Sequence, residues 1–87
     1  LDGDAWRSPF YVHLDVADEP GVLAHAASRL AAHDVSVAQL VQRLEDGRAS
    51  LNLVLHDAPL GDVRAALGEI ATFPEVLDRP FLAPVIA

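Results

Sequence analysis

A short strand-to-helix junction constrains the fold of this chain more than any other feature of its sequence. The junction reads Asp-Glu-Pro-Gly-Val-Leu at positions 18–23. Before it, apolar residues alternate from Phe10 to Val16, which is typical of a half-buried strand. After it, apolar residues recur at helical spacing from Val22 to Ala32. The chain must therefore turn sharply from a strand into a helix at this point.

Pro20 and Gly21 suit such a turn. Proline presets φ for a first helical turn, where its missing N–H costs little, so we expect Pro20 in that turn. Gly21 has no Cβ, so another group can approach the backbone beside the unpaired N–H groups of the helix start. We expect Asp18 to lie at or near the cap of the helix. The junction is predicted to receive the carboxylate of a small ligand without any catalytic side chain.

Two more strands follow as a hairpin. Residues 35–44 are rich in β-branched side chains and predict the second strand. Asp46-Gly47 then predicts a two-residue type I′ turn, which needs positive φ at both central positions. In the third strand, 49–56, three leucines alternate with other residues, so one face of this strand is predicted to be buried.

A second helix and a last strand complete the pattern. The helix opens at residues 57–59 and ends near residues 73–75. Its predicted buried stripe consists of Val63, Ala66, Leu67 and Ile70. The last strand, 76–86, is interrupted by Pro80 and Pro84, and proline cannot donate to a strand ladder. The last strand is therefore expected at an edge of the sheet.

The element order is strand, helix, strand, strand, helix, strand. This is the α+β, ferredoxin-like βαββαβ sandwich, with both helices on one face of a four-stranded antiparallel sheet of order 4-1-3-2. The second strand is then an edge strand without prolines, and such an edge invites pairing with another chain. We expect a homodimer through this strand and the first helix, with Val37, Leu40 and Val41 in the interface.

Composition excludes several classes of function. The chain has 87 residues, a net charge of −7 and only 6 basic residues, which argues against nucleic-acid binding. It has no apolar run long enough for a membrane span and no cysteine. The histidines lack metal-ligand spacing, and neither a nucleophile nor an acid–base pair is evident. We expect no metal, no catalytic residue and a cytoplasmic location, with residues 1–9 as a linker from an upstream domain and 10–87 as the folded domain.

The element order and the junction together resemble the ACT family of amino-acid-binding regulatory domains. A narrower resemblance is to the C-terminal regulatory ACT domains of bacterial homoserine dehydrogenases. It is carried by Arg-Ser-Pro-Phe-Tyr-Val-His-Leu-Asp-Val at 7–16, Pro-Gly-Val-Leu at 20–23, Val-Ser-Val-Ala at 35–38 and Val-Gln at 41–42. The resemblance implies a parent NAD(P)-dependent dehydrogenase whose catalytic domain and cofactor lie outside this chain, so no cofactor is expected here.

The same resemblance implies an effector pocket at a dimer interface for a small, threonine-like amino acid. Asp18 would hold the α-amino group, and N–H groups around Gly21, Val22 and Leu23, after Pro20, would receive the carboxylate. Contacts from across the interface would come from Ser36, Gln39 and Gln42. Serine-binding members carry His-x-Asn before Pro-Gly, whereas this chain has Val16 and Asp18.

Two alternatives to a sensor are considered. One is a structural dimerisation domain of the same fold that binds no ligand, which the departure at Val16 allows. The other is a small ferredoxin-like enzyme, which ranks last because the sequence offers no nucleophile or acid–base pair. Titration with amino acids separates the sensor from the structural domain.

Overall fold

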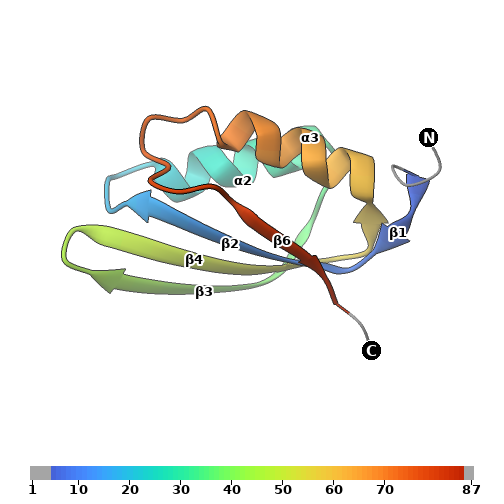
Figure 1. Cartoon of the computed structure of the whole chain (residues 1–87), viewed down its shortest axis with the longest axis horizontal. Coiled ribbons are helices and arrows are strands. Elements are labelled where there is room, and N and C mark those ends of the chain that lie inside the picture. The colour runs from blue at the N-terminus through green and yellow to red at the C-terminus, as the bar shows by residue number, and fades with distance from the viewer. Residues whose placement is uncertain (1–4, 86–87) are drawn as a thin grey trace.

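Alternating apolar residues on two neighbouring strands give the sheet one apolar face, and both helices cover that face (Figure 1). The computed structural model describes residues 5–85. The strands and helices, labelled as in Figure 1, are β1 (Arg7–Ser8), β2 (Phe10–Ala17), α2 (Val22–Ala32), β3 (Val37–Glu45), β4 (Arg48–Leu55), β5 (Ala58–Pro59), α3 (Leu60–Ile70) and β6 (Phe81–Pro84).

The core lies between β2, β4 and the two helices. Every second residue of β2 and of β4 is buried, and antiparallel pairing sets them side by side, for example Val12 opposite Leu53 and Leu14 opposite Leu51. The buried residues of α3 are the predicted stripe of Val63, Ala66, Leu67 and Ile70. Those of α2 are Val22, Ala26 and Leu30. The alternating period predicted the strand part of the core correctly. On α2 the helical period also predicts Leu23 and Ala27 in the apolar stripe, but Leu23 is only partly buried and Ala27 is exposed.

The sheet has the order β3-β4-β2-β6, which is the expected order 4-1-3-2 read from the opposite edge. All of its neighbouring strands are antiparallel. The predicted hairpin turn is also present, because φ is 51° at Asp46 and 77° at Gly47. The second strand runs over Val37–Glu45 rather than 35–44, and Val35 is buried in the core before the strand begins.

The last strand is shorter than predicted. Instead of 76–86, β6 covers only Phe81–Pro84, and Ile86 lies outside the described residues. Continuing the β6 register would place Asp78 opposite Val16, but Val76 forms that bridge. The pairing thus shifts by two residues, and Pro80, which has no N–H to donate, lies in the segment that takes up the shift.

The segment preceding β2 also differs from a plain linker. Arg7 and Ser8 pair with Pro59 and Ala58 as a two-stranded sheet, and the Leu60 N–H donates to the Trp6 carbonyl at 2.7 Å. Because β5 occupies Ala58–Pro59, α3 begins at Leu60 and not at the predicted 57–59. The origin of residues 1–9 as a linker stays a prediction.

The hairpin turn gives a test of these backbone conformations. Gly47→Ala should lower the free energy of unfolding by about 1–2 kcal/mol, because a Cβ is strained at positive φ. Gly68→Ala in α3 is the matched control: the space around its Cβ position is open, and alanine favours a helix by about 0.5–1 kcal/mol. Denaturant unfolding measures both, and a stabilised Gly47→Ala protein would contradict the assigned turn.

Candidate functional site

The junction between β2 and α2 is built around Gly21. This residue is the N-cap of α2 with φ 85°, a left-handed conformation that turns the chain into the helix. No side chain in the described part of the chain caps this helix. The expected cap role of Asp18 is therefore wrong, and Pro20 lies in the turn before the helix rather than in its first turn. A Cβ at Gly21 would meet no atom within 4 Å, so φ and not close packing requires glycine.

Two backbone hydrogen bonds hold this junction against its neighbours. The Ala17 N–H donates to the Glu75 carbonyl at 2.7 Å, in the connection between α3 and β6. The Asp18 N–H donates to the Gly47 carbonyl at 2.9 Å, in the β3–β4 hairpin turn. A displacement of the hairpin would thus be transmitted to the junction directly, because the two share a hydrogen bond.

A pocket of about 390 Å³ opens beside the junction, a size within the range of small-ligand sites. It lies between the junction, the first turns of α2 and the edge of the sheet formed by β3 and β4. Its polar side chains are those of Asp18, Glu19 and Gln42. The rest of its lining is apolar or glycine and comprises Val16, Ala17, Gly21, Val22, Leu23, Ala24, Ala27, Ala49 and Leu51.

Five of the predicted effector residues line this pocket: Asp18, Gly21, Val22, Leu23 and Gln42. Pro20 lies on the other side of the junction, in a hollow of about 290 Å³ that it shares with His25 and Glu75. Two more predicted residues are at the far end of β3 from the pocket: the Ser36 carbonyl accepts from the His56 N–H at 2.8 Å, and Gln39 pairs with Val54. Their contact with a pocket of a second copy stays a prediction.

The other lining residues were not predicted as effector contacts: Val16, Ala17, Glu19, Ala24, Ala27, Ala49 and Leu51. Ala24 and Ala27 are three positions apart on α2, so they face the same side of the helix. The helical period assigned Ala27 to the buried stripe, so its place beside the pocket was not recognised.

The second strand is exposed over its whole length. Its predicted interface residues Val37, Leu40 and Val41 expose 37%, 40% and 57% of their surface, and Leu44 exposes 60%. A β-bulge lies between Val37 and Gln39. Neither helix covers this edge strand, so its apolar side chains remain in contact with solvent. Their place in a dimer interface stays a prediction.

The face of the sheet opposite the helices carries a polar network. The Tyr11 hydroxyl donates to Asn52 Oδ1 at 2.6 Å, and His13 Nδ1 lies 2.8 Å from the same oxygen. The His13 Nε2 lies 3.2 Å from Asp15 Oδ1. The hydrogen bond to Asn52, together with the contact with Asp15, raises the pKa of His13 above its ordinary value, because both favour the protonated ring.

The same open face has a hollow of about 600 Å³ near the hairpin turn. Its charged lining residues are Asp15, Arg43, Glu45 and Arg48, and none of the predicted effector residues reaches it. Positive and negative side chains alternate there on exposed strand positions. The hollow is larger than the pocket at the junction, but it lacks the apolar walls that a small-molecule site usually has.

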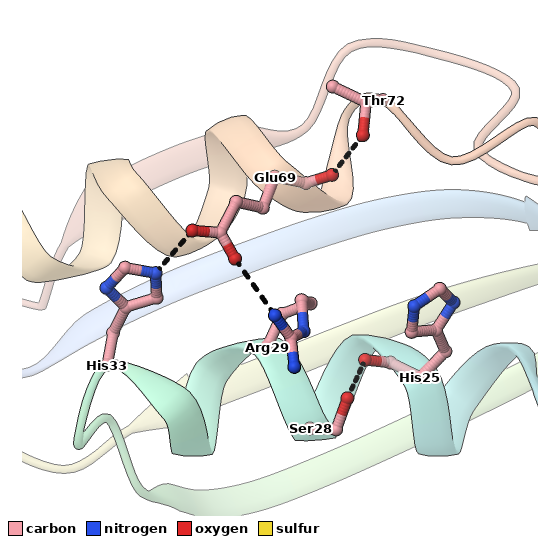
Figure 2. A network of polar contacts seen from close by, with 6 residues as sticks. All are labelled: His25, Ser28, Arg29, His33, Glu69 and Thr72. Atoms are coloured by element: carbon pink, nitrogen blue, oxygen red, sulfur yellow. Dashed lines mark hydrogen bonds and ion pairs between the residues drawn. The ribbon is translucent and has the colours of Figure 1, made fainter.

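A second polar cluster joins the two helices at the end of α2 farthest from the pocket (Figure 2). Glu69 of α3 contacts His33 Nε2 at 2.7 Å and Arg29 Nη1 at 3.5 Å. The hydrogen bond from His33, helped by the charge of Arg29, lowers the pKa of Glu69. His25 stacks on Phe73 with ring centroids 3.8 Å apart. The contacts of Glu69 hold the last turn of α2 against α3, and the His25–Phe73 stack holds its first turn against the segment that follows α3.

Among residues 5–85 no group of three or more His, Cys, Asp or Glu side chains could hold a metal ion. In the same range, no helix is both long and apolar enough to cross a membrane.

The chain is similar to parts of two homoserine dehydrogenases. It is 39% identical over 79 residues to that of Synechocystis sp. (strain ATCC 27184 / PCC 6803 / Kazusa), matching 90% of this chain and 18% of that protein. The crystal structure of a homoserine dehydrogenase from Thiobacillus denitrificans superposes with a TM-score of 0.88 at 26% identity, over 97% of this chain and 19% of that one. No protein-family model matches the sequence.

The ACT domain from the GTP pyrophosphokinase of Chlorobium tepidum has the same fold. It superposes with a TM-score of 0.73 at 12% identity, covering 90% of this chain and 100% of that domain. Fold and likeness together define the class: the chain has the fold of an ACT domain, and its sequence is similar to part of a homoserine dehydrogenase. It is related to homoserine dehydrogenase, but it spans only 18% of the Synechocystis protein and 19% of the Thiobacillus denitrificans one. The expected fold and the expected resemblance are both confirmed.

The polar network on the open face gives a pH-dependence that can be measured. Because the pKa of folded His13 is raised, its contribution to stability is fully present below the ordinary value of 6.5 and is lost as pH rises through the folded-state pKa. Asn52→Ala should lower the pKa of His13, so the stability of the folded protein should depend less on pH in this range. NMR titration of the His13 ring from about pH 5 to pH 9 measures the shift.

Ser50→Ala is the control for this test, because the Ser50 hydroxyl contacts Asn52 and not His13 in the described network. It should leave the His13 pKa close to that of the unchanged protein. Equal pKa values for His13 in all three proteins would show that Asn52 does not control the ring.

Proposed function

We propose that this chain is the effector-binding domain of a homoserine dehydrogenase. A small, threonine-like amino acid binds in the pocket at the β2–α2 junction, at an interface between two copies of the domain. Binding alters the activity of an NAD(P)-dependent catalytic domain that is not part of this chain. The observation that carries the proposal is the pocket at the uncapped start of α2, in a domain related to homoserine dehydrogenase.

The pocket offers complementary groups to each part of an amino acid. At the start of α2 the Val22 N–H donates to the Glu19 carbonyl at 3.4 Å. The amides that follow it and the positive end of the helix dipole favour a carboxylate. Gly21 leaves this end of the helix open, because no described side chain caps it. The carboxylates of Asp18 and Glu19 suit an α-ammonium group.

The remaining walls select the side chain of the ligand. Val16, Leu23, Ala27 and Leu51 present apolar surface that suits a short aliphatic side chain. The Gln42 amide can donate to or accept from a hydroxyl group. A ligand with one methyl and one hydroxyl group, such as threonine, matches both. This pairing favours a threonine-like effector over one with an anionic side chain, which would meet the carboxylates of Asp18 and Glu19.

Regulation follows from linkage between binding and the arrangement of the two copies. An effector that contacts both copies favours the arrangement in which both contacts are made, and it shifts the population by its difference in affinity. The Asp18–Gly47 hydrogen bond connects the pocket to the hairpin at the end of β3, so the position of the edge strand and the shape of the pocket change together.

A ligand-free dimerisation domain is the alternative function. The exposed apolar side chains of β3 favour self-association whether or not the pocket is occupied. In that case, the stability of the dimer would not depend on amino acids. The sensor, in contrast, must bind an effector with measurable heat or a measurable change in stability.

Calorimetric titration tests the sensor directly. Threonine should bind, and Asp18→Asn should weaken binding by about tenfold, because a charge-assisted contact with the ammonium group is lost. Asp34→Asn is the matched control: Asp34 is exposed at the other end of α2, and asparagine tolerates its φ of 60°.

The three proteins are compared at equal concentration after their dimeric state has been measured by sedimentation. Absence of heat with threonine and other small amino acids, for a folded dimer, would leave the ligand-free dimerisation domain as the function. An Asp34→Asn variant that loses as much affinity as Asp18→Asn would contradict the assigned ammonium contact.

A further inference from the structure

The regular part of β3 has a defined centre. The bulge between Val37 and Gln39 interrupts the strand at one end, and the hairpin turn follows Glu45 at the other. Between these limits, residues 39–45 pair with β4 without a break. The residue in the middle of this segment is Gln42.

Side chains of β3 divide between the two faces of the sheet. Directly paired residues point to the same face, and Leu40, Gln42 and Leu44 pair with the buried residues Leu53, Leu51 and Ala49. These three side chains therefore lie on the helix side. Val41 and Arg43 pair with Asn52 and Ser50 and lie on the open face. On the helix side, the edge thus presents an amide flanked symmetrically by two leucines.

We infer that two copies of this chain join their sheets with Gln42 of one copy directly opposite Gln42 of the other, on the two-fold axis. The inference rests on the proposed homodimer through β3 and specifies its register. The order Leu-Gln-Leu on the helix side is self-complementary under a two-fold rotation, as a symmetric interface requires. Leu40 then faces the partner's Leu44, and each Gln42 amide donates an N–H to the carbonyl of the other.

The open face is also complementary in this register. Val41 lies opposite the partner's Arg43 and packs against its aliphatic stem, while Gln39 lies opposite the partner's Glu45 and can donate to its carboxylate. No two like charges stand opposite each other. This matters because the chain carries a net charge of −7 and gains nothing from bringing copies together by charge alone.

Other two-fold registers fit the strand less well. Centring on Arg43 sets two guanidinium groups against each other, which is unfavourable. Centring on Val41 places Gln42 opposite the partner's Leu40 and leaves a buried amide without its partner, a loss that commonly specifies register. Centring on Leu44 pairs Gln42 with Asp46 in the turn and shortens the regular overlap, because β3 ends at Glu45.

The register has a consequence for the pocket. Gln42 lines the pocket of its own copy, so the pair of amides on the axis connects the two pockets. An effector that turns one amide changes the hydrogen bond available to the other. The two sites are therefore coupled, and by symmetry the coupling is equal in both directions.

The chain contains no cysteine, which allows a cysteine scan of the strand in the whole chain. Single variants Leu40→Cys, Val41→Cys, Gln42→Cys, Arg43→Cys and Leu44→Cys are oxidised mildly and resolved on a non-reducing gel. Opposite residues of antiparallel strands have Cα atoms about 4.5–5.5 Å apart, within disulfide range. Only a residue on the axis faces its own copy, so Gln42→Cys should cross-link at least about fivefold more than its neighbours, which are diagonal at about 7–8 Å.

The outcomes separate the register from the proposed function. The inference is supported if Gln42→Cys gives the highest yield of cross-linked dimer. If the yield is highest for the variant at position 41 or 43, the register is overturned but the dimer stands. Uniformly weak cross-linking, with a monomer in sedimentation of the unchanged chain, overturns the register together with the proposed dimer, whereas amino-acid binding by that monomer would still be measurable.

A charge substitution provides a second readout. Gln42→Glu should raise the dimer dissociation constant by about tenfold or more, because two carboxylates would meet on the axis in an apolar setting. Gln39→Glu is the matched control on the open face, where it approaches Glu45 of the partner at the exposed end of the strand and should weaken the dimer less. Sedimentation at matched ionic strength compares them, and a larger effect from Gln39→Glu overturns the register.

Discussion

Two helices cover one face of the sheet only in part, and most of the features of this domain follow from that limit. The buried residues of α2 and α3 lie over β2 and β4, whose inward side chains they exclude from water. None of the elements within residues 5–85 covers β3, so its leucines and valines stay exposed although they belong to the same sheet. The pocket opens where α2 stops short of this edge, and Gln42 of the uncovered strand forms part of its lining.

The junction shows how a site can be made mainly from backbone. The left-handed φ of Gly21 reverses the chain and leaves the first amides of α2 without a side-chain cap. The same residue cannot supply a cap itself, because it has no side chain. The neighbouring carboxylates of Asp18 and Glu19 line the pocket instead. The last turn of α2 is held by Glu69 through His33 and Arg29 (Figure 2), and its first turn is held by the stacking of His25 on Phe73.

The sequence predicted the core and the hairpin because both depend on local patterns. Strict alternation in β4 and the positive φ values at Asp46 and Gly47 are properties of a few neighbouring residues. The pairing of β1 with β5 and the shift of register before β6 depend on contacts between distant segments of two to four residues, which carry no periodic signal. The capping role of Asp18 failed for a different reason: the left-handed turn at Gly21 starts the helix later than a proline-led start would.

Some of the residues predicted for the site line the pocket, and others lie away from it. Asp18, Gly21 and Gln42 come from separate segments, and the fold places all three around one pocket. Gln39 shares β3 with Gln42 and Ser36 precedes that strand, and a strand rises about 3.3 Å per residue, so both lie away from the pocket. Apolar residues on both faces of β3 obscure any alternation in that strand.

The two edges of the sheet, β3 and β6, differ in length and in their capacity to pair with a further strand. β6 is four residues long, contains Pro84 and follows Pro80, so it has few backbone N–H groups with which another strand could pair. In the proposed dimer, in which β3 of one copy joins β3 of another, both remaining edges would be β6. Such an assembly would end at eight strands, because its outer edges are the short, proline-bearing ones.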